Sequence, residues 1–499
     1  MKKWFLLFLC AVLIVLKANA QEKIDLSGYW WYTTDRISDP SALVYKVGAR
    51  ISLPGSVLTN GNGGVVPLDT KRVGLLNDSS YFYDSFMSES HQRGEIKLAS
   101  LSGPKINYIG SVWYWKSFSV PKEWKKSRII FFLGRPHIKT TVYVNGKEIG
   151  HSIFSSLPHQ CDVTPYLTFG SINQIAIKVD NEIGSLALDS SSCFASSVLQ
   201  NDWNGVCGEI ELLAREKQTV VKVRIGKYDE QKHSLQVFLQ GDNGFDKGLK
   251  FLLEDSPVKV LSAENRPSQE GLMTREYHLL CFLDRWDDSH PNTYELSMVV
   301  KRDTLSTVFG IRDISVKGGQ YYINGHSVSF HGAVVDCGLS LSTSLSSNVD
   351  FWFDLFRHYK QFGVNAIRFH GICPPEAAFT AADCLGFYLE MEGPSWLSQT
   401  GSSSLKIPEN QNIVKETKRI VDIYGNHPSL VMIIAPNGAH GKSLKEENNW
   451  IKEMDQYDPR RIYCEVADGN NLAWNNVGVS KVNENHRELN VTTPVFLER

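Results

Sequence analysis

The chain has 499 residues, of which 52 are Lys or Arg and 54 are Asp or Glu, and its net charge is −2 at neutral pH. This length predicts two to four domains. A hydrophobic content of 42% with a charged content of 21% is typical of folded domains with large cores and excludes a disordered chain. The near balance of charge gives no support for nucleic-acid binding. We therefore expect a large soluble globular protein with no nucleic-acid partner.

The first 20 residues have the pattern of a secretory signal. Lys2 and Lys3 precede the apolar run 4–16, and Ala18-Asn19-Ala20 offers small residues before Gln21. The apolar run is short for a bilayer span of about 20 residues, and no later run approaches that length. We expect an exported protein, periplasmic or extracellular, whose mature chain begins near Gln21 and has no membrane partner. A retained anchor is the alternative.

Eight cysteines follow the signal, and none lies in a Cys-X-X-Cys pair. Buried small hydrophobic side chains are the expectation in a chain too large to need disulfides, and a Cys193–Cys207 disulfide is the alternative in an exported protein. We expect no metal and no cofactor.

Residues 21 to about 312 are predicted to be β-structure, because short β-branched or aromatic runs alternate with Gly, Pro, Asn and Asp. Asn145-Gly146 between two such runs predicts a tight hairpin, since both central turn residues must take positive φ. The clearest strands are 114–120, 128–133, 140–144, 174–179, 220–225 and 235–239.

After Gly318 strands alternate with helices, which predicts a parallel sheet. A strand hairpin is expected over 321–333. Helices are expected over 348–362, 374–385, 412–424 and 443–457, and strands over 364–370, 387–392, 430–435 and 461–466.

Several motifs along the chain resemble glycoside hydrolase family 2, which includes β-galactosidases, β-glucuronidases and β-mannosidases. They are Leu26-Ser-Gly-Tyr-Trp30, Leu53-Pro-Gly55, 202–212, Gly363-Val-Asn-Ala-Ile-Arg-Phe-His370, Glu392-Gly-Pro-Ser-Trp396 and Asn426-His-Pro-Ser429 followed by Asn437. The resemblance implies a jelly-roll-like sugar-binding β-sandwich over 21–214 and an immunoglobulin-like β-sandwich over 215–312. It implies a (β/α)8 TIM-barrel domain over 313–499, which looks incomplete.

The active site of such a barrel lies at the carboxyl ends of its strands. The polar residues there are the candidate substrate-binding residues: Asp336, Arg368, His370, Glu390, Glu392, Trp396, Asn437 and Glu465. Glu390 and Glu392 share one face of their strand, and we expect the barrel interior, because two acids under a helix layer would be costly unless paired. Arg368 is expected either to contact substrate or to pair with buried carboxylates. By resemblance, Asn437 would bond the 2-hydroxyl of the sugar.

The sequence differs from the family pattern at the catalytic positions. After Asn437 the family has the general acid/base Glu, whereas this sequence has Gly438, which carries no acid. The family nucleophile lies at the end of the seventh strand, and only one predicted strand follows Gly438. No catalytic residue is therefore assigned. Glu446, Glu447 and Glu465 are the nearest acids that could replace the missing one.

Three explanations stay open for the incomplete barrel pattern: a truncated or split gene, strands supplied by another chain or a homo-oligomer, and a remodelled barrel. The functional expectation is a retaining β-glycoside hydrolase of β-galactosidase type, impaired at the acid/base position and lacking the nucleophile strand. The alternative is a non-catalytic glycan-binding descendant or one part of a split enzyme. An oligosaccharide or other β-glycoside is the expected ligand in both cases.

Overall fold

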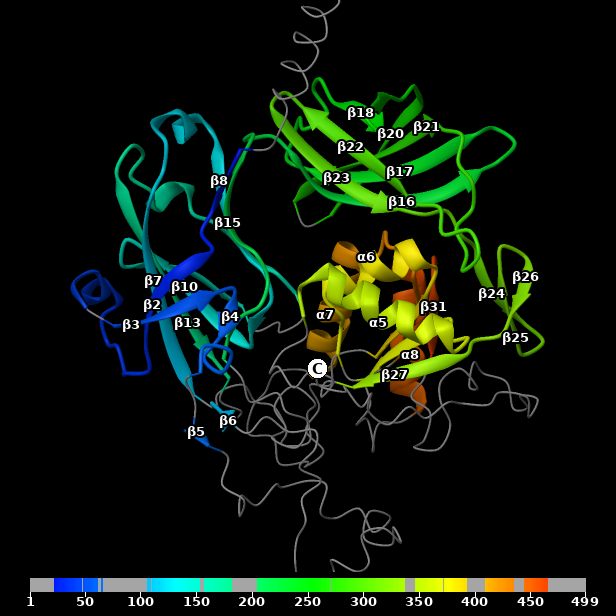
Figure 1. The fold of residues 1–499 in the computed structure, drawn as a ribbon. Helices are drawn as coiled ribbons and strands as arrows, with labels where there is room; N and C mark the ends of the chain where they lie inside the picture. Colours follow the sequence, from blue (N-terminus) through cyan, green and yellow to red (C-terminus); the bar gives the residue numbers. More distant parts are fainter. Residues whose placement is uncertain are drawn as a thin grey trace, which may run out of the picture.

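A computed structural model describes residues 22–46, 48–61, 64–65, 106–108, 110–152, 157–181, 204–269, 271–336, 346–370, 372–392, 409–434 and 444–464. The secretory-signal pattern, Cys193, Trp396, Asn437, Gly438 and Glu465 lie outside these residues. The described chain forms three bodies in sequence order, two β-sandwiches and an α/β body (Figure 1). None of the described helices is long and apolar enough to cross a membrane.

The first β-sandwich is built from two antiparallel sheets around one core. The six-stranded sheet has the order β11 (Lys147–Ser152), β10 (Lys139–Val144), β13 (Ile172–Asp180), β7 (Ser111–Ser119), β2 (Gly28–Thr33) and β3 (Ala49–Leu53). The four-stranded sheet has the order β1 (Lys23–Asp25), β15 (Ile210–Arg215), β8 (Arg128–Leu133) and β12 (His159–Asp162). Small sheets β4 (Gly55–Ser56), β14 (Gly205–Val206), β9 (Pro136–His137) and β5 (Gly64–Val65), β6 (Ile106–Asn107), with the 3-10 turns η2 (Pro40–Tyr45), η4 (Lys122–Lys126) and η5 (Thr164–Tyr166), complete it.

Alternation of apolar and polar residues explains this sandwich. Every second residue of β8 is buried in the shared core, where Phe131 and Leu133 meet Tyr114 of the facing sheet. The predicted hairpin is confirmed between β10 and β11, where Asn145 and Gly146 have φ of 50° and 78°.

The second β-sandwich has two four-stranded antiparallel sheets. Their orders are β16 (Val220–Asp229), β17 (Ser234–Gly241), β21 (Leu272–Leu280), β20 (Val260–Gln269) and β19 (Ser256–Pro257), β18 (Lys250–Leu253), β22 (Tyr294–Val300), β23 (Asp303–Phe309). Their inner faces share one core that includes Phe245, Leu296 and Phe309. Trp286 lies between β21 and β22, is fully buried, and donates from Nε1 to the backbone oxygen of Asp383 in the α/β body. It is thus an interdomain packing residue.

The α/β body opens with the antiparallel strands β24 (Ile314–Lys317), β25 (Gln320–Ile323) and β26 (His326–Val328). A five-stranded parallel sheet follows, in the order β27 (Gly332–Asp336), β28 (Ala366–His370), β29 (Tyr388–Glu392), β30 (Leu430–Ile434) and β31 (Ile462–Cys464). The helices between them are α5 (Val349–Gln361), α6 (Glu376–Leu385), α7 (Glu409–Tyr424) and α8 (Leu444–Tyr457).

The strand and helix alternation is therefore present as predicted, with one correction. The predicted hairpin over 321–333 extends too far, because β26 ends at Val328 and Ala333 pairs in parallel with Ile367 as part of β27. Ala333 belongs to the core under the helices, which explains why its apolar character continued the hairpin pattern.

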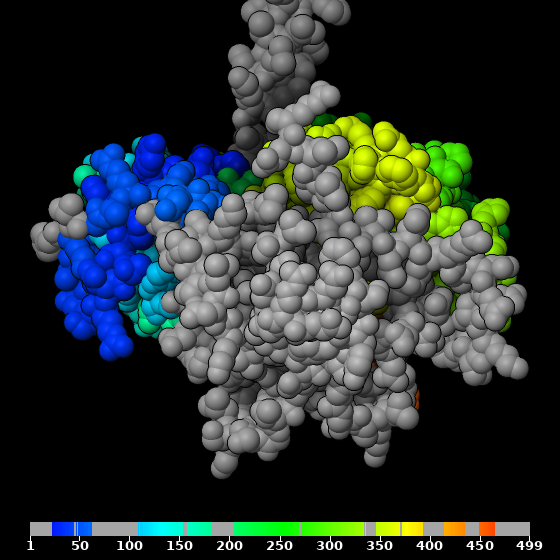
Figure 2. All heavy atoms as spheres, turned by 60° about the horizontal axis from the view of Figure 1, so that its bottom comes forward, coloured from blue at the N-terminus to red at the C-terminus, as the bar shows by residue number. Residues whose placement is uncertain are grey.

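The two faces of the parallel sheet have different partners. Ile367, Phe369, Leu389 and Met391 face the helix layer, where α5 buries Trp352, Leu355, Phe356 and Tyr359 at helical spacing. The opposite face carries the alternate residues and packs at its amino end on the β25–β26 region. In Figure 2 the first sandwich, in blue and cyan, and the helix layer, in yellow, occupy separate parts of one face of the molecule.

Candidate active site at the carboxyl edge of the parallel sheet

Strand register places the predicted site positions on two neighbouring levels of the sheet. Arg368 of β28 pairs with Glu390 of β29, and one level further Asp336 of β27 pairs with His370. Glu392 lies beside Ile434 on the same outer level. Parallel strands end at one edge, so this edge collects polar positions from three strands. The side-chain positions of Asp336 and His370 lie outside the described part of the structure.

Arg368, Glu390 and Glu392 form a charged triad, hereafter the Arg368 triad. Nε of Arg368 lies 3.3 Å from Oε1 of Glu390, and Nη2 lies 3.4 Å from Oε2 of Glu392. Arg368 is 7% exposed and both glutamates are fully buried. Of the two roles open for Arg368 in the sequence, the structure shows the pairing with buried carboxylates. The triad lies on the sheet face opposite the helices, and Glu390 and Glu392 share that face, as the two-residue period of a strand predicts.

An aromatic floor supports the triad from the amino end of the same sheet face. Tyr388 is two residues before Glu390 and packs edge-on against Phe330 at 5.3 Å and Trp286 at 5.7 Å between ring centroids. Tyr321 stacks beside Phe330 at 4.9 Å, and burial, followed by the neighbouring Cys464 and Glu390, raises the pKa of its phenol. These rings exclude water from one side of the triad and fix its position.

The start of β30 contains a second polar cluster, which sequence reasoning did not assign. Nδ1 of His427 lies 2.6 Å from Oδ2 of Asp383, and Nε2 lies 3.0 Å from Oε1 of Glu376. Burial disfavours the charged ring, but the two carboxylates outweigh it and raise the pKa of His427 to about 10. The imidazolium ties α6 to the start of β30. The sequence contained an indication of this cluster, because Glu376 and Asp383 are seven residues apart and therefore lie on one face of the predicted helix.

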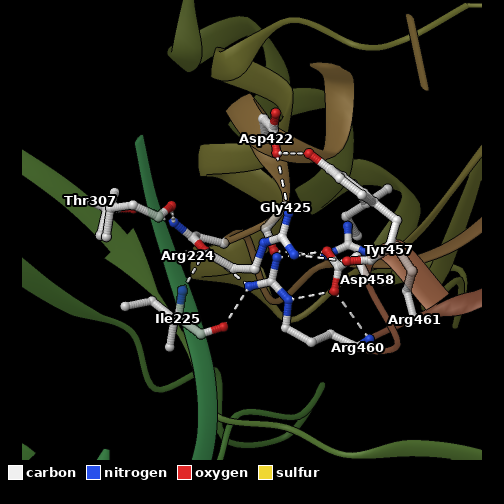
Figure 3. Close-up of polar contacts among 12 residues, drawn as sticks. Arg224, Ile225, Thr307, Asp422, Gly425, Tyr457, Asp458, Arg460 and Arg461 are labelled. Carbon is white, nitrogen blue, oxygen red and sulfur yellow. Dashed lines mark hydrogen bonds and ion pairs between the residues drawn. The ribbon is translucent and has the colours of Figure 1, made fainter. Parts of the chain in front are cut away.

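A network of arginines joins the α/β body to the second sandwich, and we call it the interdomain latch (Figure 3). Asp458 accepts from Nε and Nη2 of Arg460 at 2.7 Å each, and it pairs with Arg461 at 3.1 Å. Arg460 donates to the backbone oxygen of Ile225, and Arg224 donates to that of Tyr457. The latch therefore fastens β16 of the second sandwich to the chain between α8 and β31.

Asn426, the first residue of the family-like block 426–429, also takes part in the interdomain latch. Its amide donates to Val223 and to Thr307 Oγ1, and its carbonyl oxygen accepts from the backbone N–H of Ile225. Burial would raise the pKa of Asp458, but Arg461 and Arg460 hold it well below its usual range. The block thus has a structural role at the amino end of the sheet.

Several predicted residues cannot be placed. Trp396, Asn437, Gly438 and Glu465 lie outside the described residues, and the side chains of Glu446 and Glu447 on α8 are likewise outside them. In the described part of the chain, no group of three or more His, Cys, Asp or Glu side chains could hold a metal ion.

Comparison with known proteins now adds to this geometry. The family model "Glycosyl hydrolases family 2, sugar binding domain" matches residues 96–204, a range that includes strands β6 to β13 of the first sandwich. A β-glucuronidase of Formosa agariphila is 24% identical over 433 residues, and the match covers 79% of this chain and 42% of that protein. These matches confirm the predicted resemblance to glycoside hydrolase family 2.

Two further relatives extend the comparison. A β-galactosidase of an Arthrobacter species is 24% identical over 381 residues, covering 71% of this chain and 34% of that protein. The structure of a β-D-glucuronidase of Dictyoglomus thermophilum has a TM-score of 0.61 at 18% identity, covering 89% of this chain and 72% of that one. The chain thus spans less than half the length of the curated relatives from Formosa agariphila and Arthrobacter. The predicted family and a multidomain, β-rich fold with a sugar-binding domain are confirmed.

Proposed function

We propose that this chain is a β-glycoside hydrolase of family 2 whose sugar site is the carboxyl edge of the parallel sheet. In this proposal the five described strands are part of a (β/α)8 barrel, and the second sandwich is immunoglobulin-like. Consecutive parallel strand order with helices over one face supports the barrel assignment. Two four-stranded antiparallel sheets in about 95 residues support the sandwich assignment.

The Arg368 triad is the observation that carries the proposal. A buried ion pair contributes little net stability, because desolvation of its charges offsets their attraction. Three charged groups on one sheet face at the strand ends are therefore better explained by a binding role than by stability. Carboxylate oxygens at this position are suited to accept hydrogen bonds from sugar hydroxyls.

The substrate class proposed first is a β-galactoside. Relatives named as β-glucuronidases and β-galactosidases both match the chain, so family membership leaves both sugars open. Glu390 and Glu392 place two carboxylates beside the Arg368 guanidinium, which disfavours the approach of the carboxylate of a glucuronide. An acidic edge favours a neutral sugar.

Catalysis is proposed to be impaired at position 438. A retaining hydrolase needs an acid/base and a nucleophilic carboxyl group about 5–5.5 Å apart. Gly438 occupies the acid/base position of the family pattern, and loss of such a group costs on the order of 10²–10⁴ in rate. Asn437 would still bond the sugar 2-hydroxyl. We expect no gain in turnover from Gly438→Glu alone, because Glu390 and Glu392 are both engaged by Arg368.

Binding of a non-hydrolysable aryl thio-β-galactoside, measured by isothermal titration calorimetry, tests this site. We expect the full chain to bind it and Glu390→Gln to bind at least about tenfold more weakly, as loss of a hydrogen bond to a charged group implies. Glu453→Gln, on the exposed helix layer, is the matched control. Equal affinity of wild type and Glu390→Gln would refute the proposed site.

The second candidate function is a non-catalytic glycan-binding protein or one part of a split enzyme, favoured by Gly438. The two candidates differ in turnover of aryl β-galactosides and aryl β-glucuronides. Release of the aryl group by the purified chain, above a mock preparation, would exclude the non-catalytic function. Export to the periplasm or the medium stays a prediction, which fractionation of producing cells would test.

A further inference from the structure

The outer face of the first sandwich carries an aromatic patch far along the chain from the Arg368 triad. Tyr29 and Trp31 lie on β2, with Ser52 and Arg50 directly opposite them on β3. On the other side Trp31 pairs with Trp115 of β7, which places Ser117 on the same face. We call Tyr29, Trp31, Arg50, Ser52 and Ser117 the outer patch.

Exposure separates the outer patch from the core. Tyr29 is 72% exposed, whereas Trp30, the next residue on the same strand, is 1% exposed and lies in the sandwich core. Arg50, Ser52 and Ser117 are exposed, and Trp31 is half-buried. The patch therefore offers one large ring, a guanidinium and two hydroxyls to solvent on three neighbouring strands.

Buried aromatic rings hold the patch rigid. Trp31 packs with Trp113, Trp115 and Leu43 of η2, in a cluster outside the main core. Figure 1 shows η2 on the side of the six-stranded sheet that faces away from the other two bodies. A ligand on this face would meet preformed rings and would not have to order a loop.

The chemistry of the patch suits an acidic sugar chain. The C–H face of a pyranose ring packs on the negative face of an aromatic ring, which an exposed tyrosine provides. The Arg50 guanidinium lies 5.1 Å from the Trp31 ring centroid. Within the described residues no carboxylate lies at ion-pair distance from Arg50, so its donors are available for a ligand carboxylate.

We propose that the outer patch is an accessory binding site for a carboxylated β-glycan chain. Tyr29 stacks on one sugar, Arg50 pairs with a uronate carboxylate, and Ser52 and Ser117 bond hydroxyls. The proposal shares the glycan ligand class of the proposed function but does not depend on turnover.

Affinity electrophoresis of the full chain in native gels tests this site, with soluble polyglucuronate as one probe and its carboxyl-reduced form as the other. We expect Tyr29→Ala to weaken retardation by polyglucuronate about three- to tenfold and Tyr29→Phe to retain it, because the ring remains. Arg50→Gln should weaken binding of polyglucuronate but not of the reduced polymer.

Phe282→Ala is the matched control, because Phe282 is an equally exposed ring, 71%, just after β21 of the second sandwich. Circular dichroism of each variant checks folding. The proposal would be overturned if Tyr29→Ala bound polyglucuronate like wild type. It would also be overturned if Phe282→Ala lost as much polyglucuronate binding as Tyr29→Ala. Since no turnover is needed, a chain that hydrolyses nothing still tests it, and failure of the thiogalactoside experiment leaves it standing.

Discussion

The charged residues at the two ends of the parallel sheet make different kinds of contact. At the amino end, His427, Asp458 and Arg460 make short contacts that join α6, β30 and the second sandwich. At the carboxyl edge, the Arg368 triad buries three charges, and the ion pairs between them join the neighbouring strands β28 and β29. Charge at the amino end of this sheet therefore joins separate parts of the protein, whereas charge at the carboxyl edge joins strands within the sheet, where we propose the ligand site.

The largest effect is expected at the latch. Asp458→Asn leaves Arg460 and Arg461 in place without their shared carboxylate, and both are largely removed from solvent. Breaking such a buried pair costs about 3–5 kcal/mol of unfolding free energy. Urea denaturation followed by tryptophan fluorescence measures it, with the exposed Asp455→Asn on α8 as control. A loss below about 1 kcal/mol would show that the latch does not carry the interface.

A smaller effect is expected from His427 and depends on pH. Its pKa is raised from 6.5 to about 10 in the folded chain, so the stabilisation is complete below about pH 6.5 and is lost as pH rises through about 10. Because Glu376 is 63% exposed and solvent screens it, we expect a loss of about 2 kcal/mol over this range.

Unfolding free energy measured from pH 6 to pH 10.5 checks this dependence. His427→Phe can still stack on Phe379, as His427 does at 5.1 Å, but has no proton to lose. The variant should lack the slope seen in the wild type. Identical slopes in the two proteins would assign the pH dependence to other groups.

The smallest effect is expected at the carboxyl-edge side of the sheet, at the start of α5. Asn348 caps this helix by accepting from the backbone N–H of Asp350 at 2.9 Å. Asn348→Ala should cost about 1 kcal/mol, and Asn348→Ser close to nothing, in the same denaturation measurement. A cost as large as that of Asp458→Asn would contradict the contrast between the two ends.

Sequence patterns predicted much of this fold because the spacing of apolar residues and the placement of turn residues are local features of the chain. The β-rich region, the Asn145-Gly146 hairpin and the alternation after Gly318 follow from side-chain spacing and turn chemistry. The common face of Glu390 and Glu392 follows from the two-residue period of a strand. The end of the hairpin at Val328 was missed because Ala333 continues an apolar pattern into the next strand.

The latch and the outer patch could not be predicted in the same way. Arg224 and Arg460 are more than 200 residues apart, and their shared neighbourhood depends on how two domains pack. Tyr29 and Trp30 are adjacent aromatic residues, and only the register of β2 decides which one is exposed.

A thermal-shift measurement with and without the aryl thio-β-galactoside tests the central contrast most directly, on wild type, Glu390→Gln and Asp458→Asn. A ligand that binds only the folded chain raises its melting temperature. We predict that the ligand raises the melting temperature of wild type and of Asp458→Asn, which starts from a lower value, and raises that of Glu390→Gln by less. An equal ligand-induced rise in Glu390→Gln and wild type would contradict the account.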